Sequence, residues 1–359
     1  MNKPTSVFFI VFLILIFSAC KKKTAPDEYN RLAANPILIH TLSQQLTDVI
    51  VHDIFKPPVA SRVYTYSFLA AYETLQLQSI KYAYFSGKLN YFGPVPAPVE
   101  GKEYCLSLAS AKASAIVGDD LTFSTDKWES FEQEFFKQYK EMGIPEEVYD
   151  RSIAYGEKVA KYILEYARND NYRTTRGFRY TLKHRPGSWE PTPPTYSEAC
   201  EPQWNMIRSF TLDSSSQFLP PPPAEYNMDE ESDFLELTME VYENGKNLTE
   251  EQKSIAYFWD DNPFVTNLIG HATFTEKKMT PPGHWLEICR TVSQDRNLDM
   301  LKSVEAYTLT SIATYDAFIA SWDAKYKYER IRPMTVINNS IDQEWISFLE
   351  NPPFPEYAS

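Results

Sequence analysis

Apolar residues recur at helical spacing over most of this chain, from Ala34 to Phe348. One face of a helix returns every three or four positions, whereas a strand alternates at every second residue, and no such alternation persists here. We also find no repeat at a fixed period, which counts against a solenoid. The pattern predicts an all-α fold, a helical bundle with no more than incidental strands.

The expected helices lie between proline-rich or glycine-containing breaks. Pro57 and Pro58 are expected to interrupt the chain, and Thr249 with Gln252 has the spacing of a capping box. The aromatic-rich segment 60–81 is expected to bury one face. The predicted helical segments are residues 34–51, 60–81, 102–118, 128–142, 145–168, 229–244, 250–258, 285–293 and 297–322.

The first twenty residues have the features of an export signal. Lys3 precedes an unbroken apolar run, residues 7–17, which is too short to span a bilayer. Phe17-Ser-Ala-Cys20 resembles a lipoprotein processing box, so Cys20 is the predicted lipid-bearing residue. We therefore predict a lipoprotein signal peptide over residues 1–20, a tether over 21–28 and a membrane-anchored protein of the cell envelope, on its periplasmic or outer-membrane face.

Charge and cysteine content limit the classes of function. The formal charge is −13, which argues against nucleic acid as a partner. After Cys20 only Cys105, Cys200 and Cys289 remain, an odd number without metal-type spacing. Cys105 and Cys289 are expected to be buried thiols, and pairing of Cys200 with either of them is left open. No residue pattern supports a metal-cation site.

A cluster of cations stands out against this acidic background. Lys325 and Arg332 are seven positions apart, nearly two helical turns, so a continuous helix would bring both to one face. Pro333 would then end that helix. Such a pair suits a tetrahedral oxyanion, because Arg binds in bidentate fashion and Lys adds a point charge, with Arg330 expected outside the site. The alternative is a solvated basic helix end.

The Lys-x6-Arg-Pro pattern resembles the first signature of the vanadium-dependent haloperoxidases and the type 2 phosphatidic acid phosphatases (PAP2). Three further stretches are similar to the bacterial lipoprotein branch of that superfamily: residues 282–288, 314–323 and 351–359. The resemblance implies a helical bundle of the haloperoxidase/PAP2 type, with residues 29–224 as an N-terminal helical region that includes a Pro-rich loop. Residues 225–359 are then the first part of the haloperoxidase/PAP2-like domain.

The resemblance also implies the chemistry of the site. Lys325, Arg332 and Ser359 correspond to residues that bind vanadate in the haloperoxidases or phosphate in the phosphatases, and the substrate is then a small molecule. The family's covalent His and acid–base His have no counterpart here, because Ser359 is not followed by Gly-His. We therefore interpret the chain as the front part of a member, incomplete at the C-terminus and inactive by itself. We expect its oxyanion site to be open and wet, and segment 297–322 to expose an apolar stripe.

Two other groups of residues offer weaker signals. The irregular region 169–224 contains a run of cations between Arg173 and Arg185, which is either a solvated loop or a second anion contact in a wall of the site. Gly270-His271 and Gly283-His284 look like the missing Gly-His signature, but they precede Lys325. We therefore assign both histidines structural or capping roles, with His284 opening the segment 285–293.

A different class of function remains as an alternative. A lipid-anchored, acidic and aromatic-rich helical protein also suits a glycan-binding lipoprotein of the outer membrane. Such proteins present Trp and Tyr side chains to sugars. The missing helical repeat and the Lys325–Pro333 stretch count against this alternative.

Overall fold

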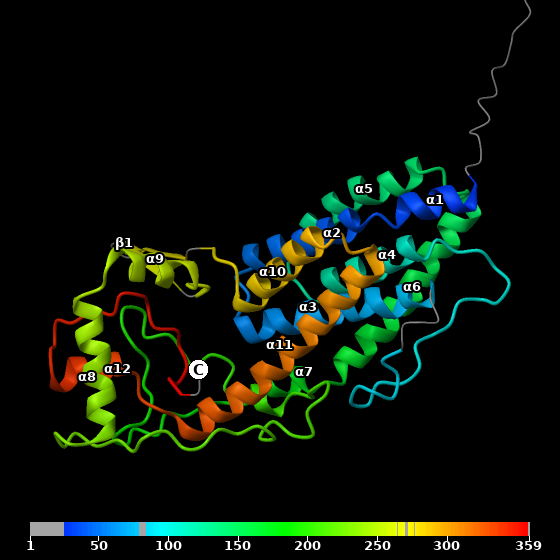
Figure 1. The fold of residues 1–359 in the computed structure, drawn as a ribbon. Coiled ribbons are helices and arrows are strands. Elements are labelled where there is room, and N and C mark those ends of the chain that lie inside the picture. The colour runs from blue at the N-terminus through cyan, green and yellow to red at the C-terminus, as the bar shows by residue number, and fades with distance from the viewer. Residues whose placement is uncertain (1–24, 79–83, 264, 270–271, 276, 358–359) are drawn as a thin grey trace, which may run out of the picture.

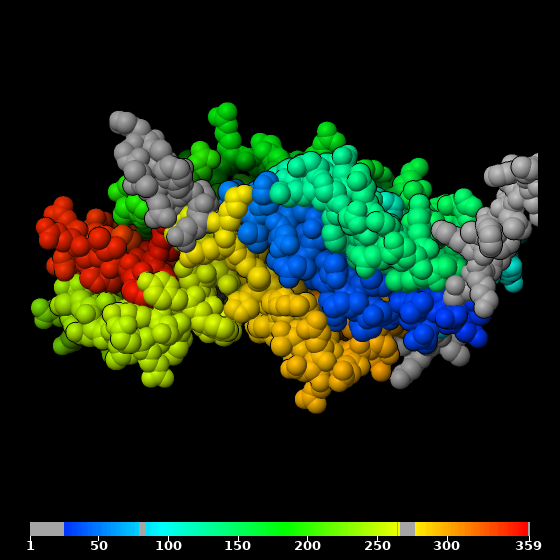
Figure 2. All heavy atoms as spheres, turned by 90° about the horizontal axis from the view of Figure 1, so that it is seen from above, coloured from blue at the N-terminus to red at the C-terminus, as the bar shows by residue number. Residues whose placement is uncertain are grey.

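The computed structural model describes residues 25–78, 84–263, 265–269, 272–275 and 277–357. Its described part is nearly all α, as predicted, and the strands form a single two-stranded hairpin. Helices α1 to α6, α10 and α11 gather at one end of the molecule, and α8, α9 and α12 lie at the other (Figure 1). A view from above shows the same division between the two groups (Figure 2).

The bundle consists of α1 (Pro26–Ala33), α2 (Pro36–His52), α3 (Pro57–Leu75), α4 (Leu106–Asp120), α5 (Thr125–Glu141), α6 (Glu146–Arg168), α10 (Pro281–Asp295) and α11 (Met300–Tyr328). The other elements are α7 (Tyr172–Thr175), α8 (Asp233–Lys246), α9 (Glu250–Phe258), β1 (Thr266–Ile269), β2 (Ala272–Thr275) and α12 (Pro333–Ser340). Since α1 begins at Pro26, residues 26–28 of the expected tether are helical. None of the described helices is long and apolar enough to cross a membrane.

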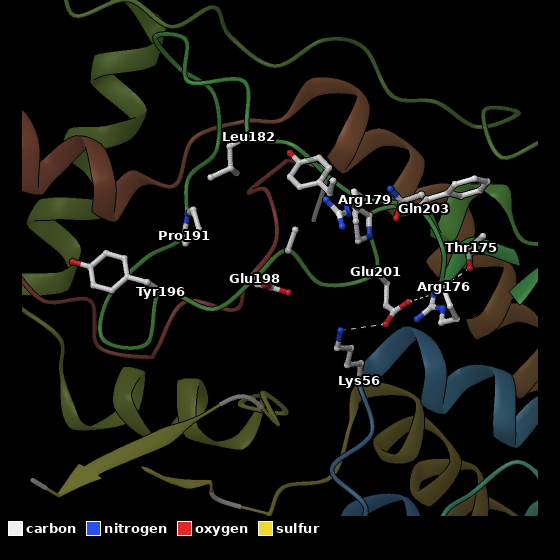
Figure 3. Close-up of a pocket in the computed structure, with 14 residues that line it drawn as sticks. Lys56, Thr175, Arg176, Arg179, Leu182, Pro191, Tyr196, Glu198, Glu201 and Gln203 are labelled. Carbon is white, nitrogen blue, oxygen red and sulfur yellow. Dashed lines mark hydrogen bonds and ion pairs between the residues drawn. The ribbon is translucent and has the colours of Figure 1, made fainter. Parts of the chain in front are cut away.

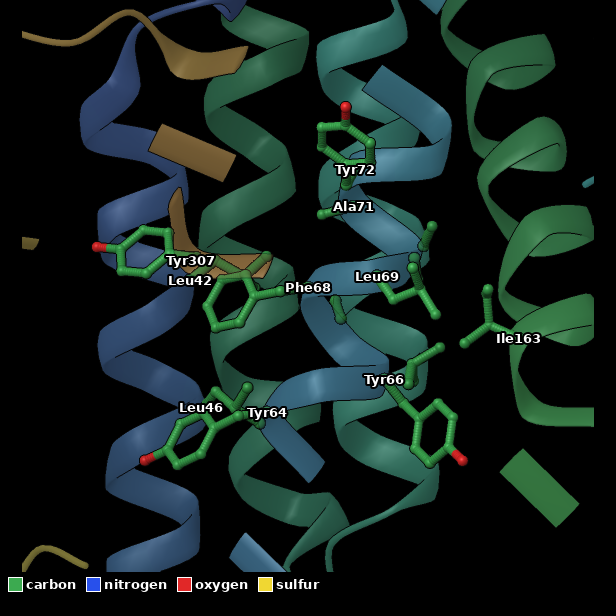
Figure 4. Packing of buried hydrophobic residues seen from close by; sticks show 14 of the residues in the cluster. Leu42, Leu46, Tyr64, Tyr66, Phe68, Leu69, Ala71, Tyr72, Ile163 and Tyr307 are labelled. Carbon is green, nitrogen blue, oxygen red and sulfur yellow. The ribbon is translucent and has the colours of Figure 1, made fainter. Parts of the chain in front are cut away.

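Helix α3 is the centre of the bundle, and every one of its residues is buried. Figure 4 shows the reason: Tyr64 and Phe68 face Leu42 and Leu46 of α2, while other residues of α3 face α6 on the opposite side. The helix therefore buries more than the one face, with Tyr64, Phe68, Tyr72 and Leu75, that its apolar spacing predicts. A helix that is enclosed by neighbouring helices has no solvent-exposed side, so its sequence shows no polar face.

The prolines at the start of α3 open the helix instead of interrupting the chain. Pro57 occupies the first turn, where a backbone N–H has no intrahelical partner and a fixed φ suits the helix. Prolines also stand in the first turn of α10 and α12. Pro57 and Pro333, which were expected to break and to stop a helix, are thus helix starts, because proline is excluded from helix interiors but not from their first turn.

The second group of helices is small and largely exposed. Thr249 and Gln252 form the predicted capping box at the start of α9, with both reciprocal hydrogen bonds present. Met334 and Ile337 of α12 make a minor core with Trp345. The antiparallel hairpin of β1 and β2 follows α9, and it was not predicted, because strands of four residues are too short to show a persistent alternation.

All three cysteines of the described chain are free thiols. Cys105 and Cys200 are buried, whereas Cys289 is only partly buried, so the prediction was right for Cys105 and wrong for Cys289. Cys200 lies in the irregular region, and its burial raises the pKa of the thiol well above the ordinary value. A disulfide between Cys200 and either of the other two is absent from this structure.

Candidate oxyanion-binding site

Helix α11 carries Lys325 in its last turn and ends three residues later. Its first turn is capped by Asp299, whose carboxylate accepts from the N–H of Lys302 at 2.8 Å. Its C-terminus is closed by Glu329, which has a left-handed φ of 48° and donates its N–H to the carbonyl of Lys325. The expected helix through Arg332 is therefore wrong, and Arg332 is instead the N-cap residue of α12.

The two cations nevertheless converge. Both lie over the ring of Phe354, with Lys325 Nζ and the Arg332 guanidinium carbon each 5.1 Å from its centroid. Lys325 Nζ donates to the carbonyls of Pro355 and Glu356 at 3.4 and 3.2 Å. Arg332 donates from Nε and Nη2 to the Phe354 carbonyl at 3.0 and 2.8 Å, and its Nη1 pairs with the Glu356 carboxylate.

The cation pair Lys325 and Arg332 is buried, which corrects the expectation of an open and wet site. The two residues are 4% and 7% exposed because residues 353–356 cover them. Burial, followed by the nearby Arg332 charge, lowers the pKa of Lys325 to about 8. Burial also lowers the pKa of Arg332, with Glu356 acting in the opposite direction. Burial of the two side chains therefore disfavours their charged forms. An added anion would offset that cost.

The groups around the pair include a carboxylate and backbone carbonyls. Glu356 is the carboxylate paired with Arg332, and its side chain is 37% exposed, so solvent screens it. Two buried cations that converge on one ring have the donor chemistry that an oxyanion requires.

The covering segment is held in place by backbone contacts to the irregular region. The Cys200 N–H donates to the Pro353 carbonyl at 2.7 Å, and the Cys200 carbonyl accepts from Trp322 Nε1 at 3.0 Å and Tyr326 Oη at 2.7 Å. The Trp322 ring also packs against Phe354 at 4.9 Å. Helix α11 thus positions both its own lysine and the segment that covers it.

The cation-rich loop forms part of the wall at the end of α11. Lys183 Nζ pairs with Glu329 Oε2 at 2.6 Å, and Tyr180 Oη donates to Glu329 Oε1 at 3.1 Å. The Trp189 N–H donates to the Glu329 carbonyl at 2.7 Å, and the Gly187 carbonyl accepts from the backbone of residue 331 at 3.0 Å. This loop therefore fixes the turn between α11 and α12.

Arg330 lies outside the pair, as expected. Its guanidinium carbon is 4.1 Å from the centroid of the Phe234 ring in α8. Its carbonyl accepts from the Glu356 N–H at 3.1 Å, so the residue contributes to the site only through its backbone. Exposed Lys327 is also turned away, and its ammonium lies 5.9 Å from the Tyr328 ring.

A cavity of about 360 Å³ opens beside Arg332, and Asp260, Asp261 and Phe354 are among its lining residues. A hydrogen bond of 2.8 Å joins His284 Nδ1 to Asp261 Oδ2, and the His284 ring stacks on Trp259. Burial raises the pKa of Asp261, against the effect of His284. His284 lies inside α10, which begins at Pro281, so the prediction that His284 opens the helix was wrong by one turn.

Three residues singled out from the sequence lie outside the described part of the chain: Cys20, His271 and Ser359. Two that matter were not singled out: Phe354 and Glu356. They belong to the stretch 351–359 that carried the resemblance, which was the available signal. Asp261 is considered from the sequence only as a possible metal ligand with Asp260, His271 and His284, a grouping whose spacing fits no motif, and nothing in its local sequence indicates that it lines a cavity with Arg332. Among described residues, no group of His, Cys, Asp or Glu is arranged to hold a metal cation.

The expected apolar stripe of α11 is narrow. Its exposed apolar residues are Leu309, Ala313 and Ala317, at successive spacings of four, and Leu309 is the only large one. The remaining large apolar residues of the helix are buried or half-buried against α3, α10 and the irregular region. Most of the surface that we expected to be unpartnered is therefore covered within this chain.

Comparison with known proteins identifies the family. A solved structure described as "the first bacterial vanadium dependant iodoperoxidase" is 38% identical and matches with a TM-score of 0.85, over 91% of this chain and 77% of that chain. The chain belongs to the vanadium-dependent haloperoxidase family. A family model for the VCPO second helical-bundle domain matches residues 305–359, which include the cation pair and Phe354.

More distant members share the fold. Apo and holo structures of a bacterial vanadium-dependent chloroperoxidase match with TM-scores of 0.58 and 0.57 at 16% identity. They cover 85% and 86% of this chain, and the matches cover 75% and 74% of those chains. No curated protein matches the chain. The haloperoxidase fold is thus established by the first structure and repeated in the other two.

Proposed function

We propose that Lys325 and Arg332 are the cationic part of a vanadate site of haloperoxidase type. The observation that carries the proposal is their convergence: cations from α11 and from the N-cap of α12 are buried together on one aromatic ring. In the family, bound vanadate supplies peroxide activation for the oxidation of halide. The same cation pair would also suit the phosphate group of a phosphatase substrate. The similarity to the iodoperoxidase structure supports halide oxidation over phosphate hydrolysis.

The residues of this chain fit an oxyanion with one rearrangement. Arg332 Nη1 pairs with Glu356, and Lys325 Nζ donates to the carbonyls of Pro355 and Glu356. An oxyanion would replace the Glu356 carboxylate as the acceptor for Arg332, while Lys325 would supply a second positive charge. Phe354 excludes water from one side, which strengthens both interactions relative to bulk solvent.

The 359 residues contain five histidines, and none follows Arg332. Each of the four described histidines has a hydrogen-bond or ion-pair partner elsewhere: His40 with Tyr307, His52 with Asp53, His184 with Glu190 and His284 with Asp261. We therefore propose that the polypeptide of residues 1–359 binds the oxyanion weakly and does not turn over substrate. The proposal extends to the cell-envelope location, with lipid attached at Cys20.

The test combines binding with turnover. Vanadate binding is measured by 51V nuclear magnetic resonance, and turnover by halide oxidation with peroxide and by p-nitrophenyl phosphate hydrolysis. We expect weak binding that is lost in Lys325→Ala and Arg332→Ala, without turnover in either assay. Lys327→Ala, which removes an exposed charge on the same turn, is the matched control. Turnover that is lost in His284→Ala would contradict the proposal and give His284 a catalytic role.

Lipid attachment is tested separately. Cys20→Ser should lose its lipid and stop partitioning into detergent, because the thiol is the proposed attachment point. Equal partitioning of the wild type and the variant would refute the anchor without affecting the vanadate site.

A further inference from the structure

We propose that a second cavity, beside the turn between α11 and α12, binds an aromatic carboxylate. The cavity has a volume of about 600 Å³, within the range of small-molecule sites, and is separate from the cavity at Arg332. It is formed between Lys56, at the start of α3, and two stretches of the irregular region, residues 175–182 and 191–203. Its binding function would be independent of vanadate.

One end of this cavity is cationic. Glu201 reaches between Lys56 and Arg176, as Figure 3 shows, and its Oε1 lies 3.3 Å from Lys56 Nζ while its Oε2 pairs with Arg176. Glu201 is 3% exposed and has a left-handed φ of 49°, a backbone conformation that costs energy for a residue other than glycine. A strained, buried carboxylate thus fixes two cations at the floor of the cavity.

Arg179 is the cation that this carboxylate does not neutralise. It lines the same cavity as Glu201 (Figure 3). Its side chain forms no hydrogen bond or ion pair with any described residue. The lining contains three cations and two carboxylates, Glu198 being the second, so it has a formal excess of one positive charge in a chain of net charge −13. A guanidinium in this position can bind a ligand carboxylate in bidentate fashion.

The other end of the cavity is apolar and aromatic. Leu182, Pro191 and Tyr196 lie on the side away from Arg176 in Figure 3. Tyr196 is 64% exposed and Phe178, another lining residue, is 47% exposed, and neither packs against another ring among the described residues. Exposed aromatic side chains around a cavity bury the most apolar surface when a planar apolar ligand covers them. An aromatic ring that carries one carboxylate therefore suits both the cationic end and the aromatic end of the cavity.

The charge pattern also selects against small inorganic anions. Such an anion would meet Arg179 but leave the aromatic end uncovered, and it would be repelled by Glu198 at the rim without compensation from ring burial. An aromatic carboxylate gains from both ends of the cavity. We therefore expect benzoate to bind more tightly than phosphate.

The experiment uses vanadate-free protein, so that its outcome does not depend on the oxyanion site. Benzoate binding is followed by saturation-transfer-difference resonance of the ring protons and quantified by calorimetry, with a dissociation constant expected on the order of 1 mM. Arg179→Gln should weaken binding about tenfold through loss of one charge-assisted contact. Glu198→Gln should tighten binding about twofold to threefold by removing repulsion.

Arg185→Gln is the matched control. Arg185 lies in the same loop and is exposed, but it does not line the cavity, so the variant makes the same change in net charge. Its benzoate affinity should stay within about twofold of wild type, because separated surface charges are screened. Equal weakening by Arg179→Gln and Arg185→Gln, absence of saturable benzoate binding, or equally tight binding of phosphate would each overturn the proposal.

Discussion

The molecule contains two groups of cations that differ in how they are neutralised. Lys325 and Arg332 are buried over one ring, and both donate to backbone carbonyls. The cations of the loop 173–185 are largely exposed, and Arg176 and Lys183 each have a buried carboxylate, Glu201 or Glu329. Burial lowers the pKa of both members of the first group, so an added anion would stabilise their charged forms, whereas most of the second group stabilises the turn and the cavity floor. Arg179 is the exception.

The largest expected effect is on Arg332. Arg332→Met should lower the free energy of unfolding by about 3 to 4 kcal/mol, because it leaves the Phe354 carbonyl without two buried donors. Urea denaturation measures the loss. Arg173→Met, at an exposed position in the loop, is the control and should stay within about 0.5 kcal/mol. Equal losses of unfolding free energy in Arg332→Met and Arg173→Met would mean that the buried pair and the loop cations contribute alike to stability.

The second effect is the pH dependence produced by Lys325. Its pKa falls from 10.5 in the unfolded chain to about 8 when folded, so the unfolded chain holds more protons between these values. Its contribution to the free energy of unfolding should therefore rise with pH across that window, by up to about 3 kcal/mol, while oxyanion binding weakens as the ammonium is lost.

Urea denaturation at pH 7 and pH 9.5 checks this prediction. The rise should be absent from Lys325→Met and kept by Lys327→Met, which alters an exposed neighbour on the same helix. An unchanged pH profile in Lys325→Met would mean that the lysine does not titrate in this window.

A smaller effect is expected from Glu356. Glu356→Gln removes the carboxylate paired with Arg332, at a cost of about 1 kcal/mol or less because the side chain is partly exposed. The same change should tighten vanadate binding about threefold, since it removes the group that competes for Arg332. A titration followed by 51V nuclear magnetic resonance measures the vanadate affinity of the variant. Weaker vanadate binding in this variant would mean that Glu356 helps to hold the anion.

The smallest effect concerns the ion pair that fixes the turn. Lys183→Met should lower the free energy of unfolding by about 0.5 kcal/mol, because Lys183 is partly exposed and solvent screens its pairing with Glu329. Tyr180 continues to donate to Glu329 in this variant and limits the loss. Thermal unfolding measures it, with Arg185→Met as control. A loss as large as that of Arg332→Met would show that loop and site cations are equivalent.

The sequence by itself determined the features that depend on neighbours along the chain. Helical spacing predicted most helices, and Thr249 with Gln252 predicted the capping box of α9, because these signals involve residues within one turn of each other. The spacing of Lys325 and Arg332 also singled out a pair that lies within residues 305–359, the region that the family model matches. The route to their convergence was predicted wrongly, since a left-handed Glu329 ends the helix first.

Only the tertiary structure decided which cations are buried and what each one contacts. The contact of Cys200 with Pro353 joins positions that are 153 residues apart, and it places Phe354 beneath Lys325 and Arg332. Lys56, Arg176 and Glu201 likewise meet only after the bundle has formed. Composition and periodicity do not encode such long-range contacts. Burial then sets the charge state of each group, because desolvation acts on a side chain according to its final position in the fold.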